Sequence, residues 1–144
     1  MKTQNYKNHR RFVLMYHSVT FPLIILLLIS SVYYTIAAFN AGTSMKPGLF
    51  LLLVSFVLLM LLYFLRTFSL KAQDRAIRAE ENFRHYLLTG KPLDSRLTIR
   101  QIIGLRFASD EEFSELAMKA ADTGMSEEDI KKAVKNWRGD YYRI

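Results

Sequence analysis

Residues 66–86 read "RTFSLKAQDRAIRAEENFRHY" and follow directly on "LFLLLVSFVLLMLLYFL" at 49–65. The chain passes from an uncharged apolar run into a densely charged stretch without a glycine or proline, so no residue forces a helix to break there. An apolar helix of about 20 residues is long enough to cross the hydrocarbon core of a bilayer. The two stretches therefore predict a membrane-spanning helix that continues into water as one helix of roughly 40 residues.

A second apolar segment lies upstream. Neither Tyr16–Phe39 nor Gly48–Leu65 contains Lys, Arg, Asp or Glu, and the connection between them is short. A domain of 144 residues could not cover two helices that are apolar on every face. A cleaved signal peptide has a shorter apolar part, of about 7–15 residues. We therefore predict a transmembrane helical hairpin over residues 16–65.

Lys and Arg residues gather at the two outer ends of this hairpin, whereas the connection holds only Lys46. Because basic segments stay on the cytoplasmic side of a membrane, we expect both termini in the cytoplasm, at a bacterial inner (cytoplasmic) membrane. Basic side chains beside the bilayer can also contact anionic lipid headgroups. The residues expected to set the topology and contact headgroups are Lys7, Arg10, Arg11, Arg66, Lys71, Arg75 and Arg78.

Most of the net charge of +7 comes from basic residues that flank the two apolar segments. Residues 1–15 contribute +4, Lys46 adds one, and residues 66–144 contribute only +2 (15 minus 13). The basic balance is therefore a topology signal rather than a sign of nucleic-acid binding. The absence of cysteine excludes disulfides, thiolate catalysis and cysteine-based zinc sites within this sequence.

Residues 66–90 form a predicted cytoplasmic stalk helix, which Gly90 and Pro92 end. Pairs in which an acidic residue precedes a basic residue by four positions favour this helix. A line of apolar residues along one side is expected to give it a packing face. The pairs are Asp74–Arg78, Glu80–Arg84 and Glu81–His85, and the apolar line is Leu70, Ile77, Phe83 and Leu87.

Residues 91–144 are predicted to form a small domain of three capped helices, Ile99–Arg106, Asp110–Thr123 and Glu127–Arg138. The capping patterns are Thr98 with Gln101, Ser109 with Glu112, and Ser126 with Asp129. A core of about 45 residues is marginal by itself, so we expect it to lean on the stalk or on a partner.

The predicted fold is thus all-α, a transmembrane helical hairpin with a long cytoplasmic stalk helix and a small helical C-terminal domain. The boundaries are 1–15 for a cytoplasmic basic N-terminus, 16–65 for the hairpin, 66–90 for the stalk and 91–144 for the domain.

No catalytic pattern stands out. The histidines His9, His17 and His85 lack metal-ligand spacing, and the acids near 110–115 and 127–129 suit the first turns of helices, where negative charge offsets the helix dipole. A phosphate-binding loop and a nucleophile elbow are both missing from the sequence. We expect no enzyme, no cofactor and no metal.

Two C-terminal features concern partners. The aromatic tail, Trp137, Tyr141, Tyr142 and Ile144, could pack back on its own domain or insert into a partner protein. The basic last helix, with Lys131, Lys132, Lys135 and Arg138, is similar to a nucleic-acid reading helix. Residues 107–144 have a net charge of −3 (6 minus 9), however, which disfavours an approach to phosphates.

The stretches "LKAQDRAIRAEENFRHYLLTGKPLDSRLTIRQIIGLRFASDEEF" (70–113) and "IKKAVKNWRGDYYRI" (130–144) resemble a family of small two-span membrane proteins from Bacteroidota, a domain of unknown function. The resemblance includes "NYKNHRRFV" (5–13) and "YHSVTFP" (16–22), and so covers most of the chain. It implies a membrane hairpin with a cytoplasmic helical tail, and it implies no activity, cofactor or catalytic residue.

Three functions are compatible with these features. The first is a non-enzymatic accessory or scaffold subunit of a larger inner-membrane assembly, with the lipid bilayer and other membrane-complex proteins as partners. The second is a homo-oligomer that forms a membrane spacer or a small pore. The third is a membrane-tethered nucleic-acid binder, which the charge of the C-terminal domain disfavours.

Overall fold

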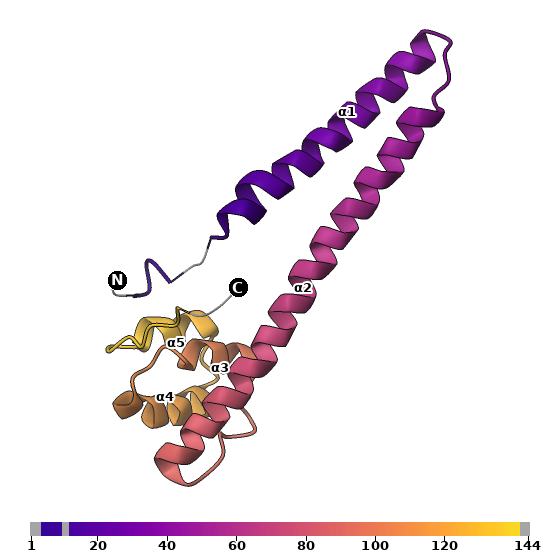
Figure 1. The fold of residues 1–144 in the computed structure, drawn as a ribbon. Coiled ribbons are helices and arrows are strands. Elements are labelled where there is room, and N and C mark those ends of the chain that lie inside the picture. Colours follow the sequence, from indigo (N-terminus) through magenta and orange to yellow (C-terminus); the bar gives the residue numbers. More distant parts are fainter. Residues whose placement is uncertain (1–3, 10–11, 142–144) are drawn as a thin grey trace. The chain divides into compact units, whose positions relative to one another are not determined.

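The structure, a computed structural model, describes residues 4–9 and 12–141, and this part of the chain is helical without a named strand. The helices are α1 (Phe21–Asn40), α2 (Lys46–Thr89), α3 (Ile99–Leu105), α4 (Asp110–Thr123) and α5 (Glu127–Ala133) (Figure 1). They belong to two compact units. The apolar unit is Arg11–Ser69, and the second unit combines Met1–Arg10 with Leu70–Ile144. The part of this second unit that follows α2, residues 91–141, is called the helical domain below.

The apolar unit is an antiparallel pair of long helices. Residues Met15–Asn40 and helix α2 are both long and apolar enough to cross a membrane by length and composition. Large apolar side chains point outward from both helices, among them Leu26, 59 % exposed, and Phe56, 57 % exposed. This exposure is the reverse of what a soluble protein does with its longest apolar helices.

Small residues occupy the few buried positions of this unit. Ser31 and Ser55 are almost fully buried, and each hydroxyl donates to a backbone carbonyl of its own helix. A Cβ atom built on Gly48 would lie 2.3 Å from Thr35 Oγ1 and 3.1 Å from Thr35 Cα. The lack of a side chain at Gly48 therefore lets α1 and α2 approach closely beside the turn that joins them.

A π-helical turn, Met15–Thr20, precedes α1. Pro22 follows as the second residue of α1. In a regular α-helix the proline ring would collide with the carbonyl four residues earlier. The wider π turn, with the Thr20 hydroxyl donating 3.1 Å to Met15 O, extends the helix upstream of that position.

The helical domain packs α3, α4 and α5 around one core to which α2 also contributes. Leu105, Phe107, Phe113 and Ile130 are fully buried, and Ile77 of α2 lies in the same cluster. Of the two expected supports for this small core, the charged stretch of α2 or a partner, the structure shows packing on α2 through Ile77. Helix α2 runs without interruption to Thr89, and Gly90, with φ +72°, ends it.

The expected apolar line along α2 is wrong. Ile77 is buried, whereas Phe83 is 61 % and Leu87 is 68 % exposed. At about 100° per residue, Phe83 and Leu87 lie roughly 240° and 280° around the helix from Ile77. The packing face instead continues from Ile77 through Glu81 to Arg84. These two charged residues pair with each other, and Arg84 also pairs with Asp110 of α4.

Helix α4 has the predicted bounds and α3 ends one residue early, but the last helix is shorter than predicted. Helix α5 ends at Ala133, and Val134 is already extended. The backbone N–H groups of Lys135 and Asn136 donate to the Glu112 carboxylate at 3.1 and 3.0 Å. These tertiary hydrogen bonds replace the helical ones, so Trp137 lies on an extended segment that bridges to Ala108.

Candidate interaction site on the helical domain

Arg84 is the centre of a largely buried ion network between α2 and the start of α4. Its side chain is only 10 % exposed, and it pairs with Glu81 at 2.9 Å and with Asp110 at 2.6 Å. Its Nη2 also donates 2.8 Å to the Ala108 carbonyl, and its guanidinium lies 4.3 Å above the Phe113 ring. One side chain thereby engages a carboxylate pair, a backbone carbonyl and an aromatic face.

This network replaces two of the expected helix pairs. Arg84 pairs with Glu81, three residues away, rather than with Glu80. The His85 ring bonds the Lys91 carbonyl at 2.8 Å rather than Glu81, and so links the end of α2 to the following loop. The Asp74–Arg78 pair is not among the ion pairs of the described residues. Arg84 keeps one acceptor on its own helix, Glu81, and gains Asp110 from the domain. The ring of His85 instead finds its acceptor in the loop after the helix.

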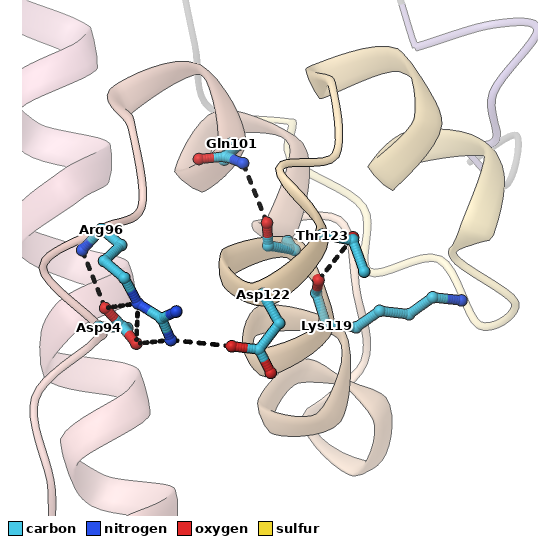
Figure 2. Close-up of polar contacts among 7 residues, drawn as sticks. Asp94, Arg96, Gln101, Lys119, Asp122 and Thr123 are labelled. Atoms are coloured by element: carbon cyan, nitrogen blue, oxygen red, sulfur yellow. Dashed lines mark hydrogen bonds and ion pairs between the residues drawn. The ribbon is translucent and has the colours of Figure 1, made fainter.

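An exposed triad links the loop before α3 to α4. Arg96 lies between Asp94, at 2.7 Å, and Asp122, at 2.9 Å (Figure 2). The hydrogen bond from Arg96 lowers the pKa of Asp94 from 3.8 to about 2. A carboxyl with a lowered pKa stays ionised in the folded state at a pH where it is already protonated in the unfolded state. The Asp94–Arg96 pair therefore stabilises the folded state above pH ~4, and this stabilisation is lost as the pH falls toward 2.

Gln101 makes the deeper connection between the same helices. Its side-chain oxygen accepts from Thr98 N at 2.8 Å, which completes the predicted capping box of α3. Its Nε2 donates to the carbonyls of Ala120 (3.2 Å) and Met125 (3.0 Å), as Figure 2 shows for the α4 side. Gln101, which the sequence predicts as a capping residue of α3, therefore also donates to carbonyls at and just after the end of α4.

The N-terminal segment 4–9 packs on the aromatic part of the domain. The His9 ring centre lies 5.7 Å from that of Phe107 and 5.8 Å from that of Trp137. The Asp140 N–H donates 2.7 Å to Gln4 Oε1, and Lys132 Nζ lies 5.8 Å over the Tyr6 ring. A hollow of about 590 Å³ between the segment and the domain is lined by Gln4, Asn5, Ser109 and Trp137 among others.

Sequence reasoning missed this contact. The sequence of the N-terminal segment predicts only a basic topology signal, and no local pattern marks His9 as a residue that packs on an aromatic ring 128 positions away. The sole hint is compositional, since Tyr6 and His9 are ring side chains within an otherwise polar, basic stretch. The rings of Phe107 and Trp137 also lie against each other, at 4.8 Å between their centres.

The predicted site residues do not form one cluster. Lys7, Lys71, Arg75 and Arg78 are exposed, and Arg66 lies 5.7 Å over the Tyr16 ring. Trp137 is half-buried against its own domain, and Tyr141 is 54 % exposed. Their roles toward lipid or a partner stay predictions. The remaining four, Arg10, Arg11, Tyr142 and Ile144, lie outside the described residues.

The chemistry of the domain is that of ion pairs and packed rings. Within residues 4–9 and 12–141, no three His, Asp or Glu side chains gather where they could hold a metal ion. Arg106, 7 % exposed, reaches Asp140 at 3.3 Å and lies 4.6 Å over Phe107. The buried charges thus hold the extended segment 134–141 against the core.

Arg84→Ala is expected to destabilise the helical domain strongly. The change leaves Glu81, whose side chain is 8 % exposed, without its closest cation, and breaking a buried pair costs about 3–5 kcal/mol. The measurement is urea unfolding followed by the fluorescence of Trp137, the single tryptophan. Arg96→Ala, which removes an exposed cation, is the matched control with little expected effect. Equal shifts of the two midpoints would contradict the central role of Arg84.

His9→Ala is expected to move the Trp137 emission to longer wavelength. Removing the His9 ring opens the half-buried indole to water on that side. The chain carries no second tryptophan, so the spectrum reports the surroundings of Trp137 alone. Lys7→Ala, an exposed change in the same segment, should leave the spectrum unchanged. Identical spectra for His9→Ala and the unmodified chain would contradict the docking of segment 4–9.

Comparison with known proteins gives a family and no activity. No curated protein and no solved structure matches the chain. A family described as a family of unknown function (DUF6526) matches residues 1–144, the full sequence. The protein therefore belongs to this family of unknown function.

Proposed function

We propose that the protein is a non-enzymatic integral protein of a bacterial inner membrane, in which a two-span hairpin anchors a cytoplasmic helical domain. The domain acts as an accessory or scaffold subunit of a larger membrane assembly. The observation that carries the proposal is the outward exposure of large apolar side chains along both helices of the apolar unit, such as Leu26 and Phe56. Lipid is the environment that makes such a surface favourable.

The N-terminal contact supports a topology with both ends on one side. Segment 4–9 packs on Phe107 and Trp137, and the two chain ends belong to one compact unit. A hairpin that crosses the membrane twice meets this requirement, whereas a single crossing does not. The basic residues around both ends favour the cytoplasmic side for that unit.

A binding role suits the domain better than catalysis or nucleic-acid recognition. Its most buried charged side chains, Arg84, Glu81 and Arg106, are engaged in holding the fold. The basic helix needed to read nucleic acid is shortened, since Lys135 and Arg138 lie beyond its end at Ala133. Lys131 and Lys132 remain on it but pair with Glu127 and Glu128.

The topology is tested with single cysteines, because the chain has none of its own. We expect Thr43→Cys, in the turn between α1 and α2, to react with a membrane-impermeant maleimide on intact spheroplasts. Lys119→Cys, exposed on α4, should react only after permeabilisation. Both variants should stay in the membrane fraction after alkaline carbonate washing. Labelling of Lys119→Cys from outside, or release by carbonate, would contradict the proposal.

The scaffold role is tested by native mass spectrometry of the full chain, purified through a tag in mild detergent. We expect stoichiometric membrane proteins beside the 16.8 kDa chain, and we expect Trp137→Ala to weaken their retention while the hairpin stays folded. Masses that are only multiples of the chain itself would contradict the accessory role.

A further inference from the structure

The membrane-distal half of α2 carries an apolar surface that the domain leaves uncovered. Phe83 is 61 %, Tyr86 54 % and Leu87 68 % exposed. Hydrocarbon does not cover them, because charged residues including Arg66, Lys71, Asp74 and Arg75 separate them from the apolar run that ends at Leu65. A cluster of large exposed side chains outside the bilayer is typical of a protein contact.

The surface continues toward the membrane as a regular stripe. It consists of Ala72, Ala76, Ala79, Phe83 and Tyr86, all exposed and spaced alternately by four and three residues. This is the spacing of the core positions in a coiled coil. At about 100° per residue, the stripe faces away from Ile77, Glu81 and Arg84, which pack on the domain. A second helix can therefore reach the stripe without displacing the domain.

Charges on either side of the stripe show which partner fits. Arg75 and Glu80 occupy the two flanking positions of the heptad pattern, g and e, five residues apart. Neither side chain has an ion-pair partner within the described part of its own chain. In a parallel pair of helices, a g residue lies opposite the e residue five positions later on the other helix. Arg75 of one copy then meets Glu80 of a second copy, and the pairing occurs twice by symmetry.

We propose that two copies of this chain associate in parallel through the α2 stripe 72–86. This inference rests on the proposed function, because anchoring both chains in one membrane with one orientation makes the two α2 helices parallel. A seam of two heptads is short for a free coiled coil. The hairpins offset this by holding the two helices at high effective concentration. The scaffold thereby presents two helical domains on opposite sides of a central helix pair.

The position of the seam is tested by disulfide crosslinking in native membranes, again on the full chain without other cysteines. Ala72→Cys lies on the stripe, and the matched control Lys71→Cys is its exposed neighbour off the stripe. We expect mild oxidation to convert Ala72→Cys mainly to a covalent dimer, twice the 16.8 kDa chain, and to leave Lys71→Cys mainly monomeric. A monomeric Ala72→Cys, or equal crosslinking of the two variants, would overturn the proposal.

The charge pairing is tested in the same assay with the Ala72→Cys chain. Arg75→Glu and Glu80→Arg, made singly, place like charges opposite each other and should each reduce the dimer. The double change restores opposite charges and should restore crosslinking, whereas a double variant as weak as the single ones overturns the parallel register. If the chain stays in carbonate-washed membranes but forms no dimer, only the self-association fails. If the chain leaves the membrane fraction, the anchor and this inference fail together.

Discussion

The continuity of α2 is the constraint on which the other features depend. No glycine or proline interrupts the chain between Leu49 and Leu88, and the 44 residues Lys46–Thr89 form one helix. A regular helix keeps a constant angular phase, so residues separated by many turns occupy predictable sides. This phase directs Ile77 and Arg84 to the domain and leaves Phe83 and Tyr86 on the opposite side.

Directional polar contacts join the domain to that helix beside the apolar contact of Ile77. Ile77 is the α2 residue in the buried cluster, whereas Arg84 contributes two carboxylate contacts, a carbonyl contact and an aromatic contact. A small core cannot bury enough apolar area to hold an outer helix by packing alone. A largely buried guanidinium is costly when unpaired, so it disfavours other placements of the domain on α2. The position of the domain on α2 is thus specified more narrowly than apolar contacts alone would specify it.

Segment 4–9 and segment 134–141 pack together on the same domain. The Glu112 carboxylate accepts hydrogen bonds from backbone N–H groups of the segment after α5. In the same segment, Trp137 packs against Phe107. That pair of rings then forms the surface on which His9 and Tyr6 pack. Segment 4–9 itself contains only a turn at residues 6–8, without a helix or strand, so its placement depends on these contacts with the domain. This contact supports the proposed topology with both termini on one side.

The sequence by itself determined the helical elements whose signals are local. The bounds of α4, the run of α2 to Thr89 and the caps at Thr98 and Ser126 all depend on neighbours within about four residues. Only the tertiary structure decided where Arg84 pairs, where α5 ends and where segment 4–9 lies. In each case a group distant in sequence takes part. Asp110 adds a second carboxylate to Glu81 at Arg84, and the Glu112 carboxylate replaces helical carbonyls as the acceptor for the backbone N–H groups of Lys135 and Asn136. The Phe107 and Trp137 rings form the surface on which His9 packs. The local sequence shows which polar and charged side chains need a hydrogen-bond or ion-pair partner. The folded arrangement determines which of the available partners is nearest and best oriented.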